Sequence, residues 1–338
     1  MRSSFLALLA LAACESPAAP AEASADGSAA PALGAVASAG GSLVPPASAA
    51  VSASAAYVSF REQRKVFATK TTKPRGPIGS APPVPPPASK LARVKYKAPL
   101  GDNWAYITPD PKDGKKHPAV VYATGGFDFS IEEVSFEKGP IDNDQSGARL
   151  RTGGAVVMYP SYRGVHDNAG TYEMLYGEVD DYLAALAHVQ ALPYVDPARI
   201  FLVGHSTGGT LVLLAAALTD GYRAALALGP VASVRWYDLE DASFDTKVAE
   251  EWDMRSPIRF VRDIKRPVFV VEGLAGGNVG DVKQLAQAGR AAGVPVAGFG
   301  IANKDHFSVI APTLESFAKK IDEDTGAGDF AWEPPGLD

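Results

Sequence analysis

Short apolar runs and longer amphipathic stretches alternate through the middle of this chain. The runs are rich in Val, Ile, Leu and Ala, and their unbroken hydrophobicity is typical of strands buried on both faces. They lie at 119–122, 155–159, 200–203, 225–228, 268–271 and 296–301. The stretches expected to be helices are 179–190, 210–218, 281–292 and 308–321. This alternation predicts an α/β fold with a mostly parallel central sheet and helices on both faces.

Two more segments near the start of this region favour a different pairing. Residues 94–97 and 104–108 alternate in polarity, and a Pro-Leu-Gly-Asp turn lies between them. Short segments joined by such a turn are expected to form an antiparallel pair of strands. The sheet is therefore predicted to begin with two antiparallel strands.

Residues 90–322 have the composition of a globular domain, and their number suits one large α/β domain. The composition changes on either side of them. Residues 15–56 are mainly Ala, Ser, Pro and Gly, and they have too few large apolar side chains to offset the entropy of ordering the chain. The segment that follows is basic and contains a polyproline run at 82–87. We therefore expect 14–89 to be a disordered and then basic linker. Residues 323–338 are rich in Gly, Pro and acidic residues, and they are expected to be a flexible tail.

The first residues have the pattern of a short bacterial export signal. An apolar stretch at 5–13 follows Met-Arg, is too short to span a bilayer, and ends at Cys14, the single cysteine of the chain. Leu-Ala-Ala-Cys at 11–14 resembles a lipobox, in which the cysteine receives lipid. We expect a lipoprotein signal peptide at 1–13, lipidation of Cys14, and a lipid-anchored protein of the cell envelope outside the cytoplasm. The alternative is an ordinary secretory signal with an unrelated cysteine.

The net charge and the arrangement of histidine and cysteine argue against some classes of partner. The net charge is −6, which gives no electrostatic support for a nucleic-acid partner. The five histidines are scattered without ligand spacing, and a lone cysteine cannot build a thiolate site. We therefore expect no metal and no cofactor.

The most specific chemical signal is Gly-His-Ser-Thr-Gly-Gly at 204–209. It stands between the predicted strand 200–203 and the predicted helix 210–218. A serine flanked by glycines at a strand-to-helix junction is typical of the nucleophile elbow of serine hydrolases, because the sharp turn leaves no room for side chains beside the nucleophile. Ser206 is therefore the predicted nucleophile. The backbone N–H of Thr207 is expected to stabilise the oxyanion.

Several further motifs occur in an order that resembles the α/β-hydrolase fold. They are Thr-Gly-Gly-Phe at 124–127, Pro-Ser-Tyr-Arg-Gly at 160–164, Gly-Glu-Val-Asp-Asp at 177–181, Tyr-Val-Asp-Pro-Ala-Arg at 194–199, and Ser-Pro-Ile at 256–258 followed by Ile-Lys-Arg-Pro at 264–267. Residues 90–322 are most similar to prolyl-oligopeptidase-type (S9) catalytic domains and to dienelactone-hydrolase-like esterases. The resemblance implies that the second oxyanion N–H comes from Gly126 or Phe127.

The base follows from the chain order of this fold, in which the serine precedes the acid and the acid precedes the histidine. His306 is the one histidine after Ser206, and it lies in a loop between the strand 296–301 and the last predicted helix. A serine hydroxyl needs such a base within hydrogen-bond reach before it can attack. His306 is therefore the predicted general base.

The acid is open between two candidates. Relatives usually carry an aspartate a few residues beyond the end of the seventh strand, but Gly276 occupies that position here. Glu272 closes the strand and has the longer side chain, so it is the first candidate for orienting His306. Asp281 is the alternative, although it is also expected to cap the next helix. A carboxylate elsewhere, such as on the loop after residue 228, stays possible.

A nucleophile, a base and an oxyanion hole together predict acyl transfer to water. We expect a serine hydrolase that cleaves carboxylic esters, or small acyl or peptide substrates, through an acyl-enzyme on Ser206. The alternatives are an S9-type serine peptidase and a catalytically silent hydrolase fold that serves as a binding protein. Residues 230–255 are expected to be either a cap over the pocket or a packed connector.

Overall fold

The computed structural model describes residues 57–73, 81–237, 240 and 242–335. The predicted signal peptide and Cys14 lie outside the described residues. Among the residues that are described, no helix has both the length and the hydrophobicity needed to cross a membrane.

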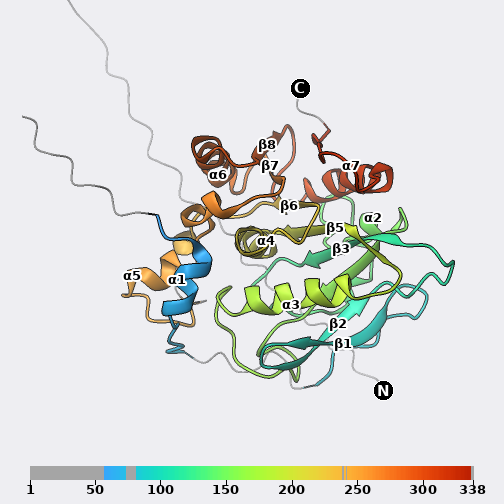
Figure 1. Ribbon diagram of the computed structural model, residues 1–338, viewed down its shortest axis with the longest axis horizontal. Coiled ribbons are helices and arrows are strands. Elements are labelled where there is room, and N and C mark those ends of the chain that lie inside the picture. The colour runs from blue at the N-terminus through green and yellow to red at the C-terminus, as the bar shows by residue number, and fades with distance from the viewer. Residues whose placement is uncertain (1–56, 74–80, 238–239, 241, 336–338) are drawn as a thin grey trace, which may run out of the picture. The chain divides into compact units, whose positions relative to one another are not determined.

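The centre of the molecule is an eight-stranded sheet with the order β1-β2-β4-β3-β5-β6-β7-β8 (Figure 1). The strands are β1 (Ala92–Ala98), β2 (Gly101–Ile107), β3 (His117–Ala123), β4 (Val156–Pro160), β5 (Val195–His205), β6 (Ala224–Leu228), β7 (Val268–Gly273) and β8 (Val296–Ile301). β1 and β2 pair antiparallel, as do β2 and β4. The remaining pairs are parallel, so every predicted strand and the leading antiparallel pair are present.

Helices cover both faces of this sheet, which confirms the predicted fold class (Figure 1). α3 (Glu178–Gln190), α4 (Thr207–Leu218) and α6 (Val279–Ala292) pack on one face, and α2 (Ala148–Arg151) and α7 (Ile310–Glu323) pack on the other. Every residue of α4 is buried, which explains why its sequence is apolar on all sides. The shorter elements are α1 (Phe60–Val66), α5 (Ala249–Asp253), η1 (Glu133–Ser135), η2 (Val234–Trp236), η3 (Pro257–Arg259) and η4 (Val261–Asp263).

The prediction of a linker up to residue 89 is wrong for its described part, because the compact unit begins at Val58. Phe60 of α1 is fully buried and stacks on Phe260 with the ring centroids 3.9 Å apart. Arg64 forms an ion pair with Asp180 at 2.6 Å. One aromatic residue and one ion pair therefore anchor a segment whose composition is otherwise that of a solvated linker.

The polyproline run also lies against the domain. The carbonyl oxygen of Pro83 accepts a hydrogen bond from the Arg93 guanidinium at 2.6 Å, and the carbonyl oxygen of Val84 accepts one from the Tyr106 hydroxyl. These bonds tie the run to β1 and β2. The extended polyproline conformation leaves its carbonyl groups available for such bonds, since it has no internal hydrogen bonds.

The prediction of a flexible C-terminal tail is wrong in its described part. Phe330 and Trp332 are buried, and both rings contact Phe317 of α7, with centroid distances of 5.8 and 5.1 Å. Arg223 forms a partly buried ion pair with Asp324 at 2.8 Å. Two aromatic rings thus cover an apolar area that α7 leaves open, although the surrounding Gly, Pro and acidic residues suggest a loose end.

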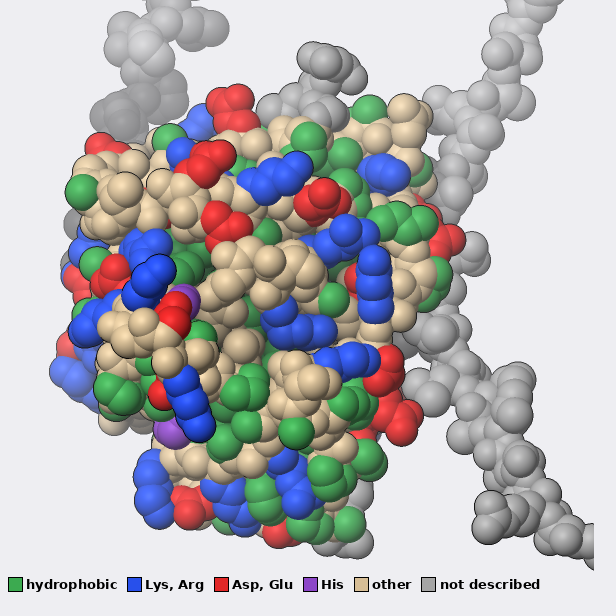
Figure 2. Space-filling view, turned by 90° about the vertical axis from the view of Figure 1, so that its right-hand side faces the viewer, with side chains coloured by type: hydrophobic (Ala, Val, Ile, Leu, Met, Phe, Trp, Pro, Cys, Tyr) green, Lys and Arg blue, Asp and Glu red, His purple; other side chains and the backbone are tan. Residues whose placement is uncertain are grey.

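The surface seen in Figure 2 carries Lys and Arg side chains interspersed with Asp and Glu side chains. This arrangement agrees with the small net charge of the whole chain.

Candidate active site

Ser206 lies at the sharp turn between β5 and α4. Its φ of 55° and ψ of −121° are strained for a residue with a side chain, and this is the geometry that lifts a serine hydroxyl above the sheet. The Ser206 N–H donates to the carbonyl oxygen of Leu228 at the end of β6, at 2.7 Å. The neighbouring strand therefore holds the turn in its strained conformation.

The flanking glycines explain why the turn can be so tight. A Cβ on Gly204 would lie 2.3 Å from the carbonyl oxygen of Gly208, and a Cβ on Gly208 would lie 2.2 Å from that of Ala123. Both obstacles are backbone atoms that have no room to move. The motif of glycines around Ser206 is thus a steric requirement of this elbow.

Glu272 at the end of β7 and His306 in the loop between β8 and α7 are brought together. Nδ1 of His306 lies 2.8 Å from Oε2 of Glu272, and the Glu272 side chain is completely buried at the end of β7. The carboxylate also accepts hydrogen bonds from the N–H groups of Gly273 and Asn278, at 2.8 and 2.9 Å. These bonds fix the carboxylate so that it accepts a hydrogen bond from Nδ1–H of His306. Nε2 of His306 is then the nitrogen that can act as a base.

Asn278 is a residue of this site that the sequence analysis missed. Its N–H donates to Glu272, and its side-chain amide donates to the carbonyl oxygen of Gly229 at 2.8 Å. Gly229 and Gly277 pack so closely on His306 and Glu272 that a Cβ on either would lie within 3.0 Å of one of these side chains. The glycines after β6 and β7 were the sequence signal for this part of the site, because a side chain packed so closely leaves room only for glycine.

Asp281 has a different environment. Its carboxylate accepts a hydrogen bond from the N–H of Ala232 at 2.7 Å, so it binds the loop after β6. Burial raises the pKa of Asp281 above its ordinary value, against the lowering effect of the bonds from Ala232 and Ser233. The helix begins at Val279, so the expectation that Asp281 caps it is wrong. Of the two candidate acids, Glu272 is the one beside His306.

The candidate oxyanion residues also lie together. The Thr207 hydroxyl donates to the carbonyl oxygen of Gly126 at 2.6 Å, which joins the start of α4 to the segment after β3. Gly126 has a φ of 91°, and an added Cβ on Gly125 would lie 3.2 Å from the Ser206 Cβ. The N–H of Thr207 has no carbonyl partner within its helix, as is general for the first turn. It can therefore donate to a developing oxyanion.

Residues 230–255 divide into two parts. Tyr237 packs perpendicular to Phe127 with centroids 4.8 Å apart, and its hydroxyl lies 2.9 Å from Oγ1 of Thr210, one turn beyond Ser206. Phe244 and Trp252, in contrast, are buried against each other at 4.9 Å. The first part borders the candidate site, whereas the second is a packed connector.

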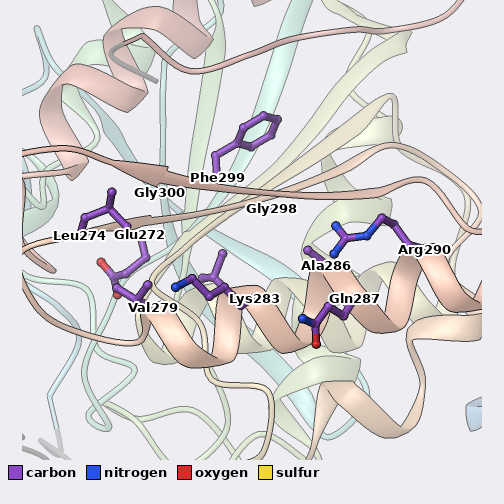
Figure 3. Close-up of a pocket in the computed structure, with 11 residues that line it drawn as sticks. Glu272, Leu274, Val279, Lys283, Ala286, Gln287, Arg290, Gly298, Phe299 and Gly300 are labelled. Carbon is purple, nitrogen blue, oxygen red and sulfur yellow. The ribbon is translucent and has the colours of Figure 1, made fainter. Parts of the chain in front are cut away.

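A separate pocket of about 200 Å³ lies between α6 and β8 (Figure 3). Lys283, Gln287 and Arg290 line it from α6, and Glu272 forms part of its wall. Its lining does not include Ser206 or His306. The pocket therefore lies behind the candidate acid and is not where Ser206 would meet a substrate.

Comparison with known proteins agrees with this geometry. Residues 145–313, half of the chain, match the model of the prolyl oligopeptidase family, Peptidase_S9. The chain belongs to this family. Ser206, Glu272 and His306 all lie within the matched residues.

Two curated relatives match this chain over part of their own length. It is 26% identical over 193 residues to dipeptidyl-peptidase 5 of Porphyromonas gingivalis, with 50% of this chain and 27% of that protein covered. It is 28% identical over 138 residues to an uncharacterized peptidase, YtmA, of Bacillus subtilis, with 37% of this chain and 54% of that protein covered. The chain thus matches only part of each relative.

Solved structures show the same fold. A puromycin-hydrolyzing peptidase of Mycobacterium tuberculosis superimposes with a TM-score of 0.58 at 20% identity, covering 73% of this chain and 41% of that one. An esterase of Pyrobaculum calidifontis superimposes with a TM-score of 0.53 at 18% identity, covering 72% of this chain and 88% of that one. These likenesses confirm the predicted α/β-hydrolase fold.

Proposed function

We propose that this protein is a serine hydrolase that cleaves short peptides or carboxylic esters through an acyl-enzyme on Ser206. The observation that carries the proposal is the 2.8 Å contact between Nδ1 of His306 and the buried carboxylate of Glu272, in the same domain as a strained serine elbow. Membership of the prolyl oligopeptidase family and the peptidase names of the curated relatives support it.

The proposed reaction starts with proton transfer from the Ser206 hydroxyl to Nε2 of His306, while the serine oxygen attacks the substrate carbonyl. Glu272 stays ionised and stabilises the imidazolium. The N–H groups of Thr207 and of Gly126 or Phe127 stabilise the oxyanion. His306 then protonates the leaving amine or alcohol, and an acyl-Ser206 intermediate remains. A water molecule, deprotonated by His306, then attacks the acyl-enzyme. His306 returns the proton to the Ser206 oxygen, and the carboxylic acid is released.

The substrate class rests on the family and on the surroundings of Ser206. Phe127 and Tyr237 form an aromatic pair beside the elbow, which suits an apolar side chain next to the scissile carbonyl. Peptides are therefore the first proposed substrates. Esters are also proposed as substrates, because an alcohol leaves with less protonation than an amine does and the same residues would cleave both.

Two assays test the proposal. A fluorophosphonate should label wild-type protein at Ser206, and peptide anilides should be hydrolysed as well as nitrophenyl esters. Hydrolysis of esters alone would identify a carboxylesterase. Absence of both labelling and hydrolysis would overturn the enzyme proposal and favour a silent hydrolase fold that binds a ligand.

We also propose that the protein is anchored to the envelope by lipid on Cys14, on the basis of the lipobox-like sequence at 11–14. Cys14→Ser should shift the protein from the membrane fraction to the soluble fraction or block its processing, because the acyl chains supply the attachment. Metabolic labelling with a fatty acid, followed by fractionation, measures the change. A wild-type protein that carries no acyl label and is fully soluble contradicts the proposal.

A further inference from the structure

We propose that the two residues flanking Ser206 are positioning residues, with His205 holding the loop of the base and Thr207 holding the oxyanion segment. Each acts through one hydrogen bond from its side chain to a backbone carbonyl: His205 to that of His306, and Thr207 to that of Gly126. The inference rests on the proposed function, since it assigns roles within the same site. It makes the elbow the part that aligns the base and the oxyanion donors with the nucleophile.

His205 is the last residue of β5, and its side chain reaches the loop between β8 and α7. Nε2 of His205 lies 3.0 Å from the backbone oxygen of His306, and the two imidazole rings lie 4.7 Å apart. The Phe307 ring is 5.8 Å from His205 on the same loop. One side chain adjacent to Ser206 thus contacts both the backbone and the ring of the predicted base.

The state of the His205 ring suits a fixed hydrogen-bond donor. A carbonyl oxygen can only accept, so Nε2 of His205 carries the proton and Nδ1 is bare. Burial, and then the neighbouring His306, lower the pKa of His205 to about 3. Nδ1 has no hydrogen-bond partner among the described residues, which fits a ring that stays neutral. A neutral donor holds the loop and adds no positive charge beside the imidazolium that forms on His306.

Thr207 makes the equivalent bond on the other side of the nucleophile. Its buried hydroxyl donates to the Gly126 carbonyl at 2.6 Å, and its own N–H is a predicted oxyanion donor. The same residue therefore sets the distance between the two halves of the oxyanion hole. Gly126 has a left-handed φ of 91°, and because glycine samples many conformations, the bond from Thr207 restrains a segment that is otherwise free to move.

Both hydrogen bonds join the elbow to loops that lie far from it in the sequence. Reaction rates respond steeply to such alignment, and a misplacement of about 1 Å can cost about 100-fold. We therefore expect these side chains to affect turnover more than substrate affinity.

The Thr207 half is tested by removing only the hydroxyl. Thr207→Val keeps the shape and the backbone N–H, and it should lower kcat at least about tenfold and weaken binding of a peptide aldehyde or boronate by a similar factor. Thr207→Ser restores the hydroxyl and should lie within about threefold of wild type. Thr313→Val is the matched control, because Thr313 is a buried threonine of α7 whose hydroxyl has no partner among the described residues.

The His205 half is tested by His205→Phe, which keeps a ring and removes the donor. It should lower kcat at least about tenfold with KM little changed, and His205→Gln should recover most of the loss because its amide N–H lies near the former Nε2. A low-field proton NMR signal from Nδ1–H of His306 should broaden in the Phe variant through faster exchange. A purely structural role for His205 would lower the melting temperature and leave this signal sharp.

These outcomes separate the inference from the proposed function. If wild-type protein is inert towards substrates and fluorophosphonate, the function fails, and the low-field signal of His306, compared between wild type and His205→Phe, still tests the His205 bond. If wild-type protein is active and both Thr207→Val and His205→Phe keep wild-type kcat, the inference is overturned. Equal losses in Thr207→Val and Thr207→Ser would also overturn it, since the hydroxyl would then be irrelevant.

Discussion

Ser206→Ala is expected to lower turnover of any ester or peptide substrate by about 10³-fold or more while the fold stays intact. The reason is that the acyl-enzyme forms on the Ser206 oxygen, and the structure around it does not depend on that oxygen. His306→Ala should cause a loss of similar size, because nucleophile and base act as one unit. Steady-state turnover of nitrophenyl esters and peptide anilides, with thermal unfolding as the check on folding, measures both.

The double variant sharpens this result. If Ser206 and His306 act together, combining the two alanines should cost little more than either alone, because one missing member already disables the pair. Additive losses would mean that the two residues act independently. Full activity of Ser206→Ala at unchanged stability would place the chemistry elsewhere in the protein.

Much of the fold was predictable because it depends on local patterns. Continuous apolar runs mark the parallel strands, and the glycines around Ser206 mark the elbow, since both follow from short-range sterics and burial. The α1 segment and the C-terminal tail were mispredicted because one or two buried aromatic residues, Phe60 in the first and Phe330 with Trp332 in the second, produce no periodicity. Their docking depends on apolar surface that exists only after the domain has folded.

The site was predictable to a smaller extent, because it depends on contacts that form only when the loops have folded. The chain order of the fold points to His306, but the partner of its Nδ1 depends on how the loop after β7 turns back. That loop brings the N–H of Asn278 to the Glu272 carboxylate, a contact that no spacing in the sequence specifies. The bonds of His205 and Thr207 to other loops are equally invisible in the sequence, because each joins residues far apart in the chain.

Glu272→Gln is expected to lower turnover by about 10⁴-fold, the loss that follows when a triad acid becomes an amide. The Glu272 carboxylate accepts three hydrogen bonds, from Gly273 on one oxygen and from Asn278 and His306 on the other. A glutamine has one oxygen, so its NH₂ group must face at least one of these donors. If it faces His306, the imidazole must present a bare Nδ1, and Nε2 then carries a proton and cannot accept one from Ser206.

The same acid-to-amide change at Asp281 is the matched control. Asp281→Asn keeps an oxygen that can accept the bond from Ala232, and the side chain is not beside His306, so turnover should stay close to that of wild type. Comparing the two amides in fluorophosphonate labelling of Ser206 separates loss of the base from loss of a loop contact. If Asp281→Asn stops labelling while Glu272→Gln labels normally, the acid is Asp281 and the contact between Glu272 and His306 has no part in turnover. If both variants label at the wild-type rate, His306 needs neither carboxylate, and the proposed triad is wrong in its third member.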